Sequence, residues 1–166
     1  MSDEKSSGGN LPESLQKLTA AAVELNAASD ELGKNIAAAD ETLKRLNLGV
    51  AAWYAFAEDA DGYPPNTSTR HLLGYARVNN KWGIALSIFK EDLVNGDVLR
   101  DEEWLFADAP RWLRIKSLDH LPKLLERLTE EAQKATGEIK AKVKLAQQFA
   151  KSLKEQAAAD AASRRK

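Results

Sequence analysis

The sequence is poor in the residue types that most often carry chemistry. It has no cysteine and only two histidines, His71 and His120, among its 166 residues. The absence of cysteine excludes disulfides, thiolate metal ligands and a cysteine nucleophile. The two histidines lack the paired spacing of a zinc motif, and no glycine-rich phosphate loop is present. We therefore expect no cofactor, no metal site and no enzymatic activity.

Long apolar runs and an excess of one charge are absent as well. No stretch of about 18 apolar residues could span a membrane, and the start, MSDEKSSGGN, lacks the apolar segment of a secretory signal. The 24 basic residues nearly balance the 25 acidic ones, for a net charge of −1. This balance is not typical of dedicated binders of nucleic acid or anionic membranes. The sequence predicts a cytoplasmic protein whose residues 1–10 form a disordered N-terminal arm.

The sequence does contain a long apolar repeat, and it occurs twice. In residues 11–47, apolar or small residues recur at alternating steps of four and three, which is typical of a coiled-coil-type helix. This repeat, called the seam of the helix below, consists of Leu11, Leu15, Leu18, Ala22, Leu25, Ser29, Leu32, Ile36, Ala39, Leu43 and Leu46. A second helix is predicted over residues 119–160, and a frayed basic tail over residues 161–166. The second seam consists of Leu121, Leu125, Leu128, Ala132, Ala135, Ile139, Ala146, Phe149 and Leu153, with Lys142 as the one discordant position.

Two helices of similar length joined by a compact insert predict an antiparallel helical hairpin with the insert at its closed end. Residues beside the first seam, such as Ala21, Asn26 and Ala28, are small and uncharged, whereas coiled coils that select a partner by charge carry Glu and Lys there. The second helix widens its apolar face with Val143 and Leu145. These features favour a homodimer that forms a four-helix bundle. The seam residues expected to mediate oligomerisation include Leu18, Leu25, Leu32, Ile36, Ile139, Phe149 and Leu153.

A second possibility for the wide apolar face is that it packs against the insert or stays half exposed.

The insert, residues 48–118, differs in character, because all four tryptophans and all three tyrosines lie there. Its β-branched and aromatic runs predict strands at 48–56, 72–78, 81–89 and 103–107, with a short helix at its end. The predicted fold class is therefore α+β, with a three- to four-stranded antiparallel β-meander between two long antiparallel helices.

The centre of the insert predicts a β-hairpin. Asn79 and Asn80 suit a type I′ turn, which pairs Val78 with Lys81 and sets the register of every later pair. One face of the hairpin then carries the bulky residues Leu73, Tyr75, Arg77, Trp82, Ile84, Leu86 and Ile88. The other face carries mainly small residues, such as Gly74 and Ala85, which allow another backbone or a flat ligand to approach closely.

These features favour a non-enzymatic interaction or scaffold protein, in which the helices oligomerise and the insert recognises a protein partner. Aromatic residues and arginine dominate interface hot spots, so the expected recognition residues are Tyr75, Arg77, Trp82 and Trp104, provided that they are exposed. One alternative is a small-ligand-sensing or regulatory module with a pocket between sheet and helices. Another is a nucleic-acid-binding accessory protein that uses the lysines of the second helix. These lysines are Lys140, Lys142, Lys144, Lys151 and Lys154.

Overall fold

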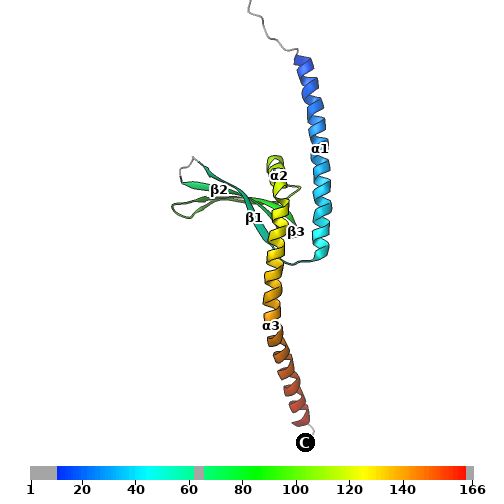
Figure 1. Cartoon of the computed structure of the whole chain (residues 1–166), viewed down its shortest axis with the longest axis vertical. Coiled ribbons are helices and arrows are strands. Elements are labelled where there is room, and N and C mark those ends of the chain that lie inside the picture. Colours follow the sequence, from blue (N-terminus) through cyan, green and yellow to red (C-terminus); the bar gives the residue numbers. More distant parts are fainter. Residues whose placement is uncertain (1–10, 62–65, 164–166) are drawn as a thin grey trace, which may run out of the picture.

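The computed structural model describes residues 11–61 and 66–163, and these form a four-stranded sheet with two long helices that both pack on one of its faces (Figure 1). The elements are α1 (Leu11–Leu46), β1 (Ala52–Asp61), β2 (Thr67–Val78), β3 (Lys81–Asp92), β4 (Val98–Leu105), α2 (Arg111–Ser117), the 3₁₀ turn η1 (Leu118–His120) and α3 (Leu121–Ser163). The α+β class with a four-stranded antiparallel meander between two helices is confirmed. The predicted N-terminal arm, residues 1–10, lies outside the described residues.

The sheet has the order β1-β2-β3-β4, so each strand pairs with the next one along the chain. Asn79 and Asn80 join β2 to β3 with φ angles of +48° and +65°, and a type I′ turn requires positive φ at both central residues. Val78 pairs with Lys81, and the rest of the hairpin follows in the predicted register. The turn chemistry of two asparagines therefore determines the pairing of the two central strands.

The chain leaves α1 at the predicted stop signals. Asn47 and Gly49 adopt positive φ angles of +48° and +64°, so the helix ends at Leu46. The first strand begins at Ala52 and not at Leu48, because the left-handed backbone at Gly49 interrupts an extended conformation.

The later elements begin and end at positions that differ from those predicted. Strand β4 covers Val98–Leu105 and not 103–107, because its charged first half also pairs with β3 at the edge of the sheet. The turn η1 precedes α3, so this helix starts at Leu121, two residues later than predicted. Because α3 continues to Ser163, residues 161–163 belong to the helix and not to a frayed tail.

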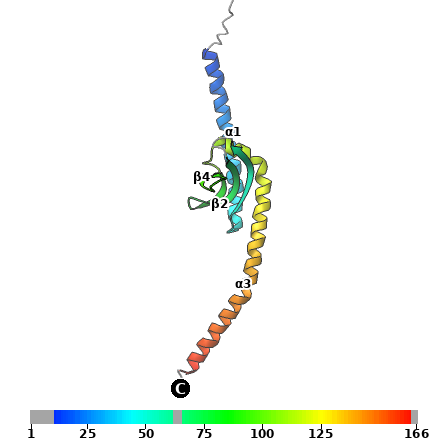
Figure 2. The ribbon, with the colours of Figure 1, turned by 90° about the vertical axis from the view of Figure 1, so that its left-hand side faces the viewer.

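The two long helices run in the same direction, so the predicted antiparallel hairpin is wrong. The short α2 lies beside the middle of α1, where Arg111 donates a hydrogen bond to Asn26 Oδ1 at 2.9 Å. Leu121, at the start of α3, lines a cavity together with Thr42 of α1. The next turns of α3 then pass the end of α1. Because α2 returns the chain to the side of α1 before α3 starts, the two helices extend beyond the sheet in opposite directions (Figure 1, Figure 2).

The hydrophobic core lies between the sheet and the helices. The bulky face of the central hairpin turns towards it, with Leu73 and Leu86 fully buried. The helices contribute the buried residues Ile36, Leu113, Leu124 and Leu128. On the other face of the sheet, Trp53 of β1 covers Gly74 so closely that a Cβ atom on this glycine would lie 2.2 Å from Cε3 of the tryptophan. The sheet, α2 and the packed parts of α1 and α3 together are called the head below.

Helix α1 is joined to the sheet by a carboxylate. Strand β4 ends at Leu105 opposite Ala85, so none of the described strands lies beside the edge of β3 beyond this point. Asp40 of α1 reaches this edge, and the backbone N–H of Ile84 donates a hydrogen bond to Asp40 Oδ1 at 2.8 Å. The carboxylate thus satisfies a backbone donor that the sheet leaves open.

Candidate interaction surfaces

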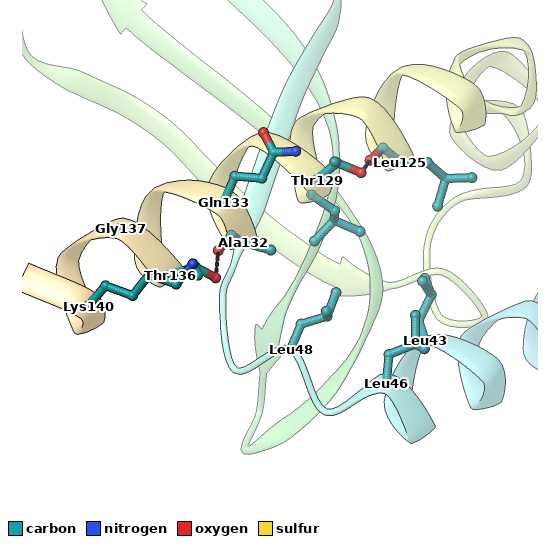
Figure 3. A pocket seen from close by; sticks show the side chains of 11 residues that line it. Leu43, Leu46, Leu48, Leu125, Thr129, Ala132, Gln133, Thr136, Gly137 and Lys140 are labelled. Atoms are coloured by element: carbon teal, nitrogen blue, oxygen red, sulfur yellow. Dashed lines mark hydrogen bonds between the residues drawn. The ribbon is translucent and has the colours of Figure 1, made fainter. Parts of the chain in front are cut away.

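An apolar groove lies between the end of α1 and the first turns of α3 (Figure 3). Leu43, Leu46 and Leu48 form one side, and Leu125 and Leu128 belong to the other side. The groove has a volume of about 570 Å³. Since both seams contribute leucines to it, the seams of the two helices meet here.

Four polar side chains line this groove, Thr129, Gln133, Thr136 and Lys140, and the two threonines among them bond to their own helix. Thr129 donates a hydrogen bond to the carbonyl of Leu125 at 2.8 Å, and Thr136 donates one to the carbonyl of Ala132 at 2.8 Å. The second of these bonds is drawn in Figure 3. The groove therefore presents mainly apolar surface, which suits an apolar side chain better than a polar metabolite.

A second cavity of about 370 Å³ continues the groove towards the sheet. It lies between Leu43, Ile84 and Leu124, and its only polar side chain among the lining residues is Thr42. The hydroxyl of Thr42 donates a hydrogen bond to the carbonyl of Ala38 at 3.0 Å. Binding pockets for small molecules combine apolar walls with a few convergent polar groups, and this cavity presents no such set.

Beyond the head, both seams are exposed. The N-arm, defined as residues 11–28 of α1, is exposed throughout, and Leu18 is 65% exposed. The C-arm, defined as residues 137–163 of α3, exposes Phe149 at 66% and Leu153 at 55%. The predicted oligomerisation residues Leu18, Leu25, Ile139, Phe149 and Leu153 all lie on these arms with exposed side chains.

The other two predicted oligomerisation residues lie within the head. Ile36 is buried in the core, and Leu32 is partly buried against it. The assignment of Ile36 to an interface between copies is therefore wrong, because the sheet of its own chain covers this turn of α1.

The predicted recognition residues do not form one exposed surface. Tyr75 is buried and its ring stacks on Trp82, with ring centroids 5.6 Å apart. Trp82 and Trp104 are partly buried and pack against the core, and Arg77 alone is exposed. The aromatic face of the hairpin is thus mainly scaffold, because the helices need a bulky surface to pack against.

The sheet carries two surfaces that the sequence analysis missed. One is a hollow of about 290 Å³ between β1 and β4, where the Arg70 guanidinium lies 5.0 Å from the ring centroid of Phe89. The other is the tip of the β3–β4 connection, where four large apolar side chains are exposed. These are Leu93, Val94, Val98 and Leu99. Their clustering depends on the turn geometry, in which Asp92 Oδ1 accepts a hydrogen bond from the N–H of Val94 at 2.8 Å.

The electrostatics of the head centre on Asp40. Lys44 forms ion pairs with Glu41 at 2.9 Å and with Asp40 at 3.0 Å, and these partners raise the pKa of Lys44 to about 12. Burial raises the pKa of the Tyr75 hydroxyl, and the negative charge of Asp40 adds to this rise. These shifts accompany the contact between α1 and the sheet and do not point to acid–base chemistry.

Both histidines make aromatic contacts. His120 stacks on Phe56 with centroids 5.2 Å apart, and His71 meets the edge of Trp112 at 5.3 Å. Among the described residues there is no group of three or more side chains that could hold a metal ion. None of the described helices has an apolar stretch sufficient to cross a bilayer.

Comparison with known proteins gives no relative for this chain. No protein-family model matches it, and neither a curated protein nor a solved structure matches it.

Proposed function

We propose that this protein is a non-enzymatic scaffold that forms a homodimer through the seams of its two helices. The observation that supports this proposal is the exposure of the seams on both arms. The 4–3 repeat continues past the head in both directions, although the head covers only the inner part of each helix.

The exposed seams are large enough to favour association. Leu11, Leu15, Leu18 and Leu25 are each at least half exposed on a single stripe of the N-arm. Burial of one such side chain stabilises by roughly 1.5–3 kcal/mol, so a partner helix that covers several of them gains a substantial free energy. Contiguous exposed apolar stripes of this kind mark interaction sites, whereas isolated exposed leucines do not.

Mass measurement in solution tests the proposal. Sedimentation equilibrium should give twice the chain mass of 18.2 kDa, with dissociation on dilution. The variant Leu25→Asn should weaken the dimer at least about tenfold, because it removes one buried leucine from each copy. Val23→Asn is the matched control, because Val23 is similarly exposed on the same helix but lies off the seam.

Equal effects of the two variants would contradict a role for the seam. A wild-type chain that stays monomeric at every accessible concentration would overturn the proposal itself. Circular dichroism of both variants shows whether α1 remains helical, which is needed because leucine has a higher helix propensity than asparagine, whereas valine and asparagine are similar.

A further inference from the structure

We infer that the N-arm of one copy pairs in antiparallel orientation with the C-arm of a second copy, about a two-fold axis perpendicular to the long axis of the molecule. This inference rests on the proposed dimerisation and specifies its geometry. It assigns the second copy of the chain as the occupant of both exposed seams.

The placement of the helices supports this geometry. Thr42 of α1 and Leu121 of α3 line the same cavity, so the two helices overlap only near this level. From here α1 extends to one side by about 45 Å and α3 to the other side by about 63 Å, at 1.5 Å per residue (Figure 1). A two-fold axis near this level places α1 of each copy along α3 of the other, with opposite chain directions.

This single arrangement covers every exposed part of both seams. The central groove lies near the axis, and there Leu46 and Leu125 remain 61% and 52% exposed. Farther out, the N-arm and the C-arm of opposite copies lie side by side. A pairing of α1 with α1, or of α3 with α3, would leave the other two arms exposed. The inferred interface is self-complementary and closed, as is usual for two-fold dimers.

The charges of the helices favour the same pairing. The N-arm carries two acidic residues and one basic residue, a net charge of −1, whereas the C-arm carries five basic and three acidic residues, a net charge of +2. Between Ile139 and Lys154 the second helix has five lysines and no acidic residue. Cross-pairing brings this basic stretch beside the acidic side chains Glu13 and Glu24 of the N-arm, and like-with-like pairing would bring equal charges together.

The sizes of the side chains beside the seams are complementary too. The N-arm carries the small residues Ala21 and Ala28 there, whereas the C-arm carries the larger Val143 and Leu145. Large residues on one helix pack best between small residues on the other.

Introduced cysteines test the inference directly, because the chain has none of its own. In the inferred dimer Leu18 lies opposite residues 145–153 of the second copy. Purified Leu18→Cys is mixed in turn with Leu145→Cys, Phe149→Cys and Leu153→Cys, each carrying a different tag, and the mixture is oxidised. We expect a mixed disulfide between the two tagged chains for at least one of these positions. Val23→Cys, which lies off the seam, should give at least about fivefold less mixed disulfide with the same partners.

The homodisulfide of Leu18→Cys distinguishes the inferred pairing of α1 with α3 from a pairing of α1 with α1. In the inferred dimer the two Leu18 positions lie roughly 70 Å apart, so this variant alone should not form a covalent dimer. Efficient covalent dimerisation of Leu18→Cys alone would overturn the inference and leave the proposed dimer intact. A monomeric wild-type chain in sedimentation, including one that co-sediments with anionic lipid vesicles, would overturn both.

Discussion

Leu128 and Phe149 occupy corresponding positions in the repeat of α3, yet Leu128 is 3% exposed and Phe149 is 66% exposed. Helix α1 shows the same contrast, because Ile36 is buried in the core whereas Leu18 is exposed to solvent. In each helix one continuous pattern thus serves two environments. The inner turns pack against the sheet of the same chain, whereas the outer turns have an apolar surface of the same kind that none of the described residues covers.

This contrast shows that periodicity defines a face of a helix and leaves open what covers it. The head has a core of its own, built from sheet, α2 and the inner turns of both helices. Within residues 11–61 and 66–163 no second layer packs on the arms, so their stability as helices depends on helix propensity and on partners. Substitutions that act on one region and not on the other can test this division.

The largest effect is expected from a cavity in the head. Leu86 on β3 has no exposed surface, so Leu86→Ala should lower the free energy of unfolding by about 2–5 kcal/mol. Leu18→Ala on the N-arm should change it by less than about 0.5 kcal/mol at concentrations where the chain is monomeric. Urea denaturation followed by tryptophan fluorescence measures this, because all four tryptophans lie in the head. Similar losses in both variants would show that head and arms unfold as one unit.

Alanine substitutions at two glycines should change the stability of the protein in opposite directions. A Cβ atom on Gly74 would collide with the Trp53 ring, so Gly74→Ala should cost about 1–3 kcal/mol in the head. A Cβ atom on Gly137 would meet nothing within 4 Å, so Gly137→Ala should stabilise α3 by up to about 1 kcal/mol. Thermal unfolding by circular dichroism compares the two variants. A neutral Gly74→Ala would mean that Trp53 can move aside.

The smallest expected effect is a fall in the free energy of unfolding at alkaline pH, which involves two groups of the head. Tyr75 and Lys44 both have raised pKa values in the folded chain, with that of Lys44 at about 12. Each group binds its proton more tightly when folded, so its contribution is complete below the unfolded pKa, near 10, and is lost as the pH rises through the folded value. The free energy of unfolding should therefore fall between pH 9 and about pH 12. Tyr75→Phe should make this fall shallower in urea titrations, and an unchanged slope would contradict the role of this tyrosine.

Local features of the fold could be predicted from the sequence because neighbouring residues determine them. The Asn79–Asn80 turn fixed the register of β2 with β3, and Asn47 with Gly49 marked the end of α1. The direction of α3 could not be predicted in this way, because it depends on how α2 docks against α1. One contact that holds α2 there joins Arg111 to Asn26, which are 85 residues apart in the chain.

Of the candidate surfaces, the exposed seams could be predicted from the sequence and the role of the hairpin face could not. The exposed seams followed from the repeat, and Leu18, Leu25, Ile139, Phe149 and Leu153 lie where a partner helix could reach them. The recognition role of the hairpin face did not follow from its composition. A bulky alternating face has the same sequence pattern whether it meets a partner or its own helices, and here Tyr75 lies within the core.

The order of the strands has a mechanical consequence. Helix α1 is connected to β1 and α3 is connected through α2 to β4, and these two strands are the opposite edges of the sheet. The far ends of the two helices also point away from each other (Figure 1). A force that pulls the chain by its two ends is therefore borne by the three strand ladders together with the contacts of α1 with α2 and α3, such as the hydrogen bond from Arg111 to Asn26. The two arms transmit such a pull to the head, where these contacts lie.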